Sequence, residues 1–150
     1  MGVHRQVRIH HGTFEADVDE GIADLILEMW RAGIETVSSC QEPVAGFVQV
    51  WLTADSAKRF AQVVLPFEDP DDSMYARALK RTEDEDQDWM WSANIDDAGL
   101  MCDIDDDEII WSHTGVGEWE ILLAVYFPHS DQDEILDRLR RSNARNPDGG

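Results

Sequence analysis

The chain has 150 residues, 43% of them hydrophobic and six of them tryptophan, which is enough apolar surface for one domain with its own core. Its formal net charge of −20 repels nucleic acid and anionic membranes and therefore argues against direct binding to either. No apolar run approaches the roughly 18 residues that span a bilayer. Because the segment MGVHRQVRIHHG also lacks the apolar stretch of a signal peptide, we expect a cytoplasmic protein.

The N-terminal segment predicts a strand followed by a helix. Apolar residues alternate with polar ones over residues 3–10, which is the pattern of a half-buried strand. Asp17 and Glu20 have the spacing of a capping box, and the apolar stripe that follows runs to Arg31 and Gly33, which are typical of a helix end. We therefore expect the first helix to be capped by Asp17 and to end at Gly33.

A hairpin and a second helix are expected next. Short strands over residues 34–39 and 47–53 flank the segment EPVAG, which has the composition of a turn. Thr53 or Asp55 can then cap an amphipathic helix, and Pro66 stops it.

The second half begins with a short helix over residues 72–81 and then changes to a meander of strands separated by acidic or glycine-containing turns. The strands are expected at residues 89–95, 100–104, 108–113 and 118–127. Nearly every position from Ile121 to Phe127 is apolar, so the last strand should be central in its sheet. Ser130 and Asp133 open a final helix, and residues 142–150 are expected to form a flexible tail.

These elements predict a single α+β domain over residues 1–141. We expect an antiparallel or mixed sheet with helices on one face, a split βαβ-like first half, then a β-meander and a C-terminal helix.

Acidic residues are concentrated in the second half of the chain. Residues 1–66 carry a net charge of −4, whereas residues 67–150 carry −16. Such acidity can be an adaptation for solubility or salt, or it can serve to recognise a basic partner. The candidate binding residues combine these carboxylates with one aromatic contact; they are Asp84, Asp86, Asp103, Asp105, Asp106, Asp107, Glu108 and Trp51.

The leading hypothesis is therefore a small acidic, non-enzymatic binding protein that recognises a basic protein surface. A sharper form is a nucleic-acid mimic, such as a phage-derived regulator, which needs ordered carboxylates near the density of duplex DNA, about one charge per 1.7 Å of axis. If Phe47 and Trp51 lie opposite the apolar face of their strand, an aromatic surface is left for a partner. A homo-oligomer that pairs through exposed strand edges is a further alternative.

Cys40 is the centre of the alternative hypothesis, a small enzyme or ligand-binding domain. Ser39 precedes it, and His10 could approach it from a neighbouring strand. A nucleophilic thiol needs a nearby base, a cation or a helix amino end. None follows Cys40 in the sequence, and the negative charge of the chain opposes thiolate formation, so a half-buried residue at a strand end is the competing interpretation.

The segment LILEMWRAGIETVSSCQE, residues 25–42, resembles a pattern in small uncharacterised bacterial and phage proteins, where a helix leads through Ala-Gly to a Thr-x-x-Ser-Cys strand end. The resemblance covers under a fifth of the chain and implies no established activity. It singles out Thr36, Ser39 and Cys40 for testing.

We expect no metal and no cofactor. Asp103, Asp105 and Asp107 offer oxygen ligands for Ca²⁺ or Mg²⁺, but an EF-hand loop needs glycine where Glu108 stands. The five histidines form no HExxH motif, and the two cysteines are too far apart in sequence for a paired-thiolate zinc site.

Overall fold

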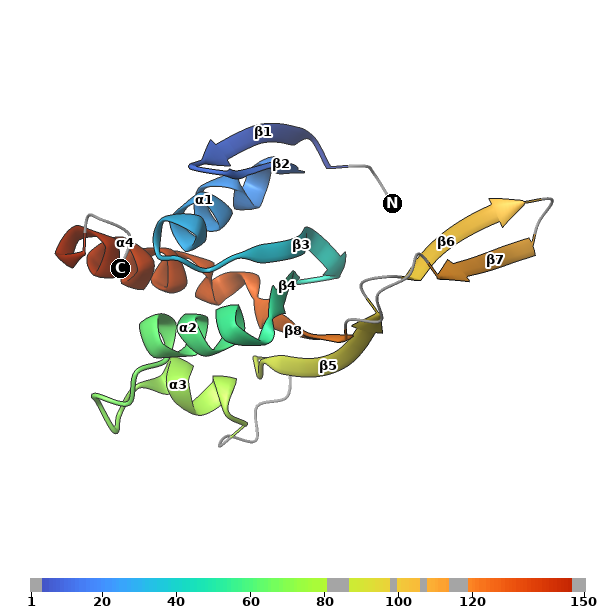
Figure 1. Cartoon of the computed structure of the whole chain (residues 1–150). Coiled ribbons are helices and arrows are strands. Elements are labelled where there is room, and N and C mark those ends of the chain that lie inside the picture. The colour runs from blue at the N-terminus through green and yellow to red at the C-terminus, as the bar shows by residue number, and fades with distance from the viewer. Residues whose placement is uncertain (1–3, 81–86, 98–99, 106–107, 114–118, 147–150) are drawn as a thin grey trace.

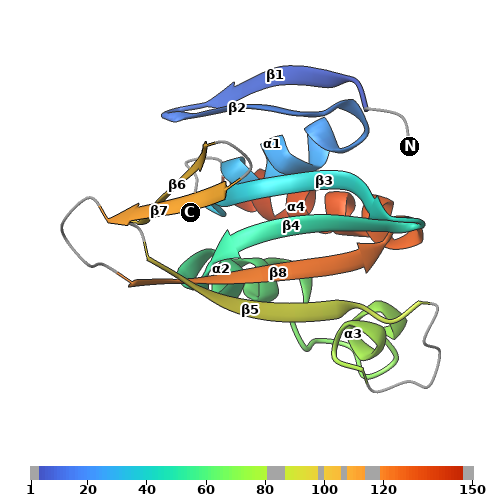
Figure 2. The same ribbon diagram turned by 90° about the vertical axis from the view of Figure 1, so that its right-hand side faces the viewer.

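The computed structural model describes residues 4–80, 87–97, 100–105, 108–113 and 119–146, and for residues 96–119 it describes the backbone alone. Within these ranges a four-stranded antiparallel sheet forms the centre of the molecule, and the helices lie on one side of it (Figures 1 and 2). The strand order is β3 (Thr36–Val44), β4 (Phe47–Thr53), β8 (Trp119–Pro128) and β5 (Met90–Asp97). The helices are α1 (Ala23–Arg31), α2 (Ala54–Val64), α3 (Ser73–Ala78) and α4 (Gln132–Arg145).

This arrangement confirms the α+β prediction, with helices on one face of the sheet and a C-terminal helix. It also confirms the central place of the last strand, because β8 pairs with β4 on one side and with β5 on the other. None of the described helices is long and apolar enough to cross a membrane.

The core lies between one face of the sheet and the helices. In β4 the residues Val48, Val50 and Leu52 have no exposed surface, and their neighbours in the strand are half-buried, as strand alternation requires. The helices supply an apolar stripe each to this core: Leu25, Ile26 and Met29 from α1, Phe60 and Val64 from α2, and Ile135 and Leu139 from α4. Each large side chain so buried contributes about 1.5–3 kcal/mol relative to exposure.

The N-terminal segment departs from the prediction. β1 (Gln6–His11) pairs with a second strand, β2 (Phe14–Asp19), and the two form a separate hairpin instead of joining the main sheet (Figure 1). The expectation that Asp17 caps the first helix was wrong, because Asp17 lies in β2 opposite Arg8. The Arg8 guanidinium bridges Glu15 at 3.1 Å and Asp17 at 3.2 Å across the hairpin. A 3₁₀ turn over Glu20–Ile22 then leads into α1.

Two element boundaries also differ from expectation. β3 continues through the segment that was expected to be a turn, so that Glu42 and Pro43 lie in the strand and the chain reverses at Gly46, whose φ is +85°. At the other end, α4 runs to Arg145, so the expected domain boundary at residue 141 falls inside the helix.

The meander is a pair of nested hairpins. β5 pairs with β8, and between them in sequence β6 (Leu100–Asp105) pairs with β7 (Glu108–His113) as a two-stranded sheet of its own. We call the β6–β7 hairpin the arm. Figures 1 and 2 show that it projects from the side of the main sheet opposite the helices.

Candidate functional site

The face of the main sheet that points away from the helices is the first candidate site. Because side chains alternate along a strand, Phe47, Gln49 and Trp51 point away from the buried face of β4. No described helix lies over this face (Figure 2). The expectation that Phe47 and Trp51 lie opposite the apolar core face is therefore confirmed.

Strand register defines the other members of this surface, which we call the open face. Residues directly opposite one another on paired strands point to the same side, so Trp51 shares its face with Ser38 and Ala124, and Tyr126 shares it with Gln49 and Met90. The open face comprises Ser38, Cys40, Phe47, Gln49, Trp51, Met90, Ser92, Asn94, Leu122, Ala124 and Tyr126.

The open face carries no charged side chain along the length of these eleven positions. The same register continues this face to Asp96 in β5, which lies opposite Glu120 in β8. The first charged residue beyond them in β8 is Glu120, which is exposed and lies at the end of the sheet from which the arm continues. The surface is therefore neutral in its middle and acidic at the arm end.

Aromatic and amphipathic side chains give the open face its contact area. Trp51 and Tyr126 are half-buried, and Met90 is 39% exposed. The Gln49 amide donates a hydrogen bond to the Tyr126 hydroxyl across 2.7 Å, which fixes two polar groups near the centre of the face. Tryptophan and tyrosine at such positions offer a large apolar body with a polar handle, which is typical of binding surfaces.

The candidate acidic residues fall partly on the arm. Asp103 and Asp105 lie in β6, and Glu108 lies in β7 opposite Asp105. The arm and Trp51 are on the same side of the main sheet (Figures 1 and 2). The remaining candidates, Asp84, Asp86, Asp106 and Asp107, lie outside the described residues.

Cys40 lies on the open face, half-buried and opposite Gln49. Ser39 is opposite Val50 and so points to the other side of β3. His10 pairs with Glu15 near the turn of the β1–β2 hairpin.

The hairpin contacts β3 at its other end, which separates His10 from Cys40. There the backbone N–H of Gln41 donates to the Asp19 carboxylate at 2.8 Å. Asp19 is four register positions from Glu15, which is about 13 Å of strand. The structure therefore places Cys40 beside the uncharged groups of the sheet and does not bring His10 and Ser39 together around it.

Asp19 and Gln41 have structural roles in this region that were not recognised from the sequence. The side chain of Gln41 accepts a hydrogen bond from the Gly21 backbone N–H at 2.9 Å, while the buried Asp19 holds the backbone of Gln41. A Cβ atom at Gly21 would lie 2.4 Å from the Gln41 amide oxygen, so a larger residue there would displace the Gln41 side chain from this position. The polar segment after Cys40 thus serves to fasten β3 to the β2–α1 connection.

Among the residues that the structure describes, no three His, Cys, Asp or Glu side chains are grouped to hold a metal ion. No family model matches the chain, and no solved structure matches it. The chain is similar to the uncharacterised protein R428 of Acanthamoeba polyphaga mimivirus, with 27% identity over 148 residues, which is 94% of this chain and 71% of that protein. The similarity therefore extends over nearly the whole chain.

Proposed function

We propose that this protein is a non-enzymatic binding protein that docks its open face and acidic arm onto a basic protein surface. The observation that carries the proposal is a neutral, aromatic sheet face that none of the described helices covers, in a chain with a net charge of −20. Surfaces that bind protein partners commonly have an uncharged centre with aromatic residues and a polar or charged rim.

The two parts of the surface have different roles in the proposed complex. The open face supplies apolar area, at about 25 cal/mol for each Å² removed from water, before the costs of association are subtracted. The arm and Glu120 supply negative charge at one end, which speeds encounter with a basic partner and fixes its orientation. A matching partner has an apolar patch bordered by lysine or arginine.

A second copy of the chain is a poorer partner for this face. Self-association would bring together two net charges of −20, and this repulsion has no compensating basic rim on the open face. Close mimicry of nucleic acid is also a weaker proposal. Asp103 and Asp105 are two residues apart in β6, a spacing of about 6.8 Å, whereas one DNA strand carries a charge about every 3.4 Å.

A pull-down with matched charge variants tests the proposal. Ser92→Arg places a cation on an exposed position of the open face, and Ala144→Arg makes an equal charge change on the exposed surface of α4. We expect the wild-type chain and Ala144→Arg to retain a basic protein at about 50 mM salt, and Ser92→Arg to lose it. Retention should also fall at about 500 mM salt, where the Debye length is only a few Å.

The opposite results would refute the proposal. If no specific partner binds at low salt, or if the same partner binds Ser92→Arg as strongly as the wild type, the open face is not the docking surface. Sedimentation of the free chain distinguishes a heterologous partner from a second copy.

A further inference from the structure

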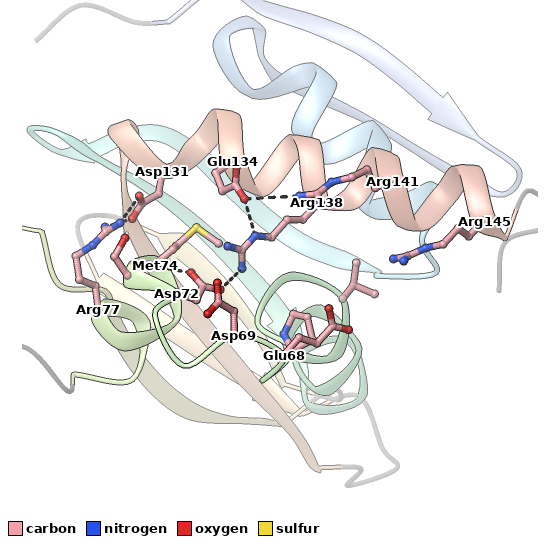
Figure 3. A pocket seen from close by; sticks show the side chains of 13 residues that line it. Glu68, Asp69, Asp72, Met74, Arg77, Asp131, Glu134, Arg138, Arg141 and Arg145 are labelled. Carbon is pink, nitrogen blue, oxygen red and sulfur yellow. Dashed lines mark hydrogen bonds and ion pairs between the residues drawn. The ribbon is translucent and has the colours of Figure 1, made fainter.

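A cavity of about 610 Å³ lies on the helix side of the molecule, between α4 and the α2–α3 connection (Figure 3). It is separate from the open face, which is on the opposite side of the main sheet. Val63, Pro66 and Met74 give it an apolar part. Its other lining residues are mostly charged, with five carboxylates and four arginines, so the lining has a net charge of −1 in a chain of −20. Four of the ten arginines in the sequence therefore gather at this cavity.

Some of these charged residues form ion pairs with one another that stabilise the fold. The Arg138 guanidinium contacts Asp72 at 2.9 Å and Glu134 at 2.9 Å, and it also donates to the carbonyl of Val64 at 2.8 Å. Arg77 forms a two-pronged pair with Asp131. The side chains of both arginines are largely buried and have carboxylate partners, so a ligand would find no free charge on them.

The remaining charges lie on facing walls. Arg141 and Arg145 project from α4, while Glu68 and Asp69 belong to the α2–α3 connection (Figure 3). Among the described residues, Arg141 pairs with Asp137 at 2.9 Å and with Glu134 at 3.6 Å on its own helix, so its charge is also partly neutralised although the side chain is 61% exposed. Arg145 makes no side-chain ion pair with any residue in the described ranges. Arg138 and Asp72 join the two walls at 2.9 Å, but no ion pair of 4.0 Å or less joins Arg145 to Glu68 or Asp69, so the cavity keeps this cation apart from two acids.

From this arrangement we infer that the cavity binds a short peptide with free termini. The peptide carboxylate is held by Arg145, and its ammonium group is held by Glu68 and Asp69. Apolar side chains of the peptide pack against Met74 and Pro66. The volume is within the usual range for ligand sites, roughly 300–1,000 Å³, and exceeds what one amino acid fills.

The charge of the whole molecule favours this class of ligand over a simple anion. A net charge of −20 repels a free carboxylate or phosphate at long range, whereas a zwitterion has no net charge to repel. Within the cavity each end of a zwitterion meets a wall of opposite sign. Guanidinium groups also suit carboxylates geometrically, because they can donate two parallel hydrogen bonds.

Titration calorimetry with trileucine tests this inference on the full chain. Free trileucine should bind, and N-acetylated or C-amidated trileucine should each bind about tenfold more weakly, because each lacks one charged end. Arg145→Gln should weaken binding of free trileucine and should reduce the difference in affinity between free and C-amidated trileucine. Glu68→Gln should also weaken binding of free trileucine, and it should reduce the difference in affinity between free and N-acetylated trileucine.

The control variant is Arg140→Gln, which changes an exposed arginine of the same helix that does not line the cavity. It should leave trileucine affinity unchanged. Absence of binding at millimolar trileucine would overturn the inference. The inference would also fail if neither blocking the peptide termini nor Arg145→Gln changed the affinity. Because the open face is not involved, Ser92→Arg should bind trileucine normally, so failure of one proposal is distinguishable from failure of the other.

Discussion

Asp131 is a buried acid whose carboxylate connects three segments of the chain. Its carboxylate accepts hydrogen bonds from the Arg77 guanidinium and from the Trp89 indole N–H, the latter at 3.0 Å, and its side chain is only 7% exposed. These bonds join α3, the start of β5 and the start of α4. A pair of charges removed from water in this way is stable only while both partners are present.

Loss of one partner of this pair should be strongly destabilising. We expect Asp131→Ala to lower the free energy of unfolding by about 3–5 kcal/mol, because it leaves the Arg77 cation buried without a counter-charge. Urea denaturation followed by tryptophan fluorescence measures the change. Asp133→Ala, two residues further on and exposed, should change it by no more than about 0.5 kcal/mol. Equal losses in the two variants would contradict this account of Asp131.

Asp72 makes stability depend on pH in the acid range. Burial raises the pKa of its carboxyl, but hydrogen bonds from Arg138 and from the backbone N–H groups of Tyr75 and Met74 outweigh burial and hold the pKa below its ordinary value. The unfolded chain has the ordinary value of about 3.9. The contribution of the carboxylate is therefore fully present above this value and is lost as the pH falls through the lower, folded-state pKa.

Comparison with Asp72→Asn isolates this effect. The difference in unfolding free energy between the wild type and Asp72→Asn should be largest at pH 6–7, by about 1–2 kcal/mol, and should shrink steadily below about pH 4. Denaturation curves at a series of pH values measure it. A difference that stayed constant down to pH 2 would show that the Asp72 charge is not the cause.

Sequence patterns predicted the face on which a side chain lies more reliably than they predicted contacts between residues distant in the sequence. Alternation in β4 was sufficient to place Trp51 and Phe47 opposite the core, because the period of a strand leaves no other choice. The pairing of Arg77 with Asp131 could not be predicted in the same way. The two residues are 54 positions apart, and only the tertiary fold, which sets α3 near the turn before α4, brings them together.

At the scale of elements, strong amphipathic stripes were predicted correctly and a polar strand was missed. The segment FEADVD in β2 is half acidic, and its spacing to Glu20 imitates a helix cap. It becomes a strand because it pairs with β1 along its whole length, Gln6 opposite Asp19 to His11 opposite Phe14. Such tertiary pairing overrides a local capping pattern, and one sequence alone does not reveal it.

The start of α2 illustrates a local signal that does hold. Thr53 was one of two expected caps, and its hydroxyl accepts a hydrogen bond from the Ser56 backbone N–H at 3.2 Å. Thr53→Ala should lower the free energy of unfolding by about 1 kcal/mol, whereas Thr53→Ser should be nearly neutral because it retains the hydroxyl. Thermal denaturation of the two variants measures this difference. If both variants lost equal stability, the methyl group of Thr53 would be responsible instead of the cap.

At the scale of the whole molecule, the main sheet separates two surfaces of different character. The helix side holds the core and the mixed-charge cavity, while the other side holds the uncharged open face and the arm (Figures 1 and 2). Composition alone revealed the acidity but not this division. The acidic segments were expected to supply charge and nearby aromatic residues to supply contact area; the structure sets a neutral aromatic face on the same side of the sheet as the arm, which carries three of the candidate acids.

Removal of the arm should separate its electrostatic role from that of the open face. Asp97 pairs directly with Trp119, so residues 98–118 can be replaced by Asn-Gly, a dipeptide that suits a two-residue hairpin. The deletion removes six acids and no lysine or arginine, which changes the net charge from −20 to −14. Because β6 and β7 pair only with each other in the described sheets, we expect unfolding to remain cooperative.

Association with the basic partner should slow by about three- to tenfold at low salt, with a smaller loss at high salt, since the arm contributes long-range attraction. Surface plasmon resonance at several salt concentrations measures both rates. A dissociation rate that rises steeply while the association rate is unchanged would instead place the arm in direct short-range contact with the partner.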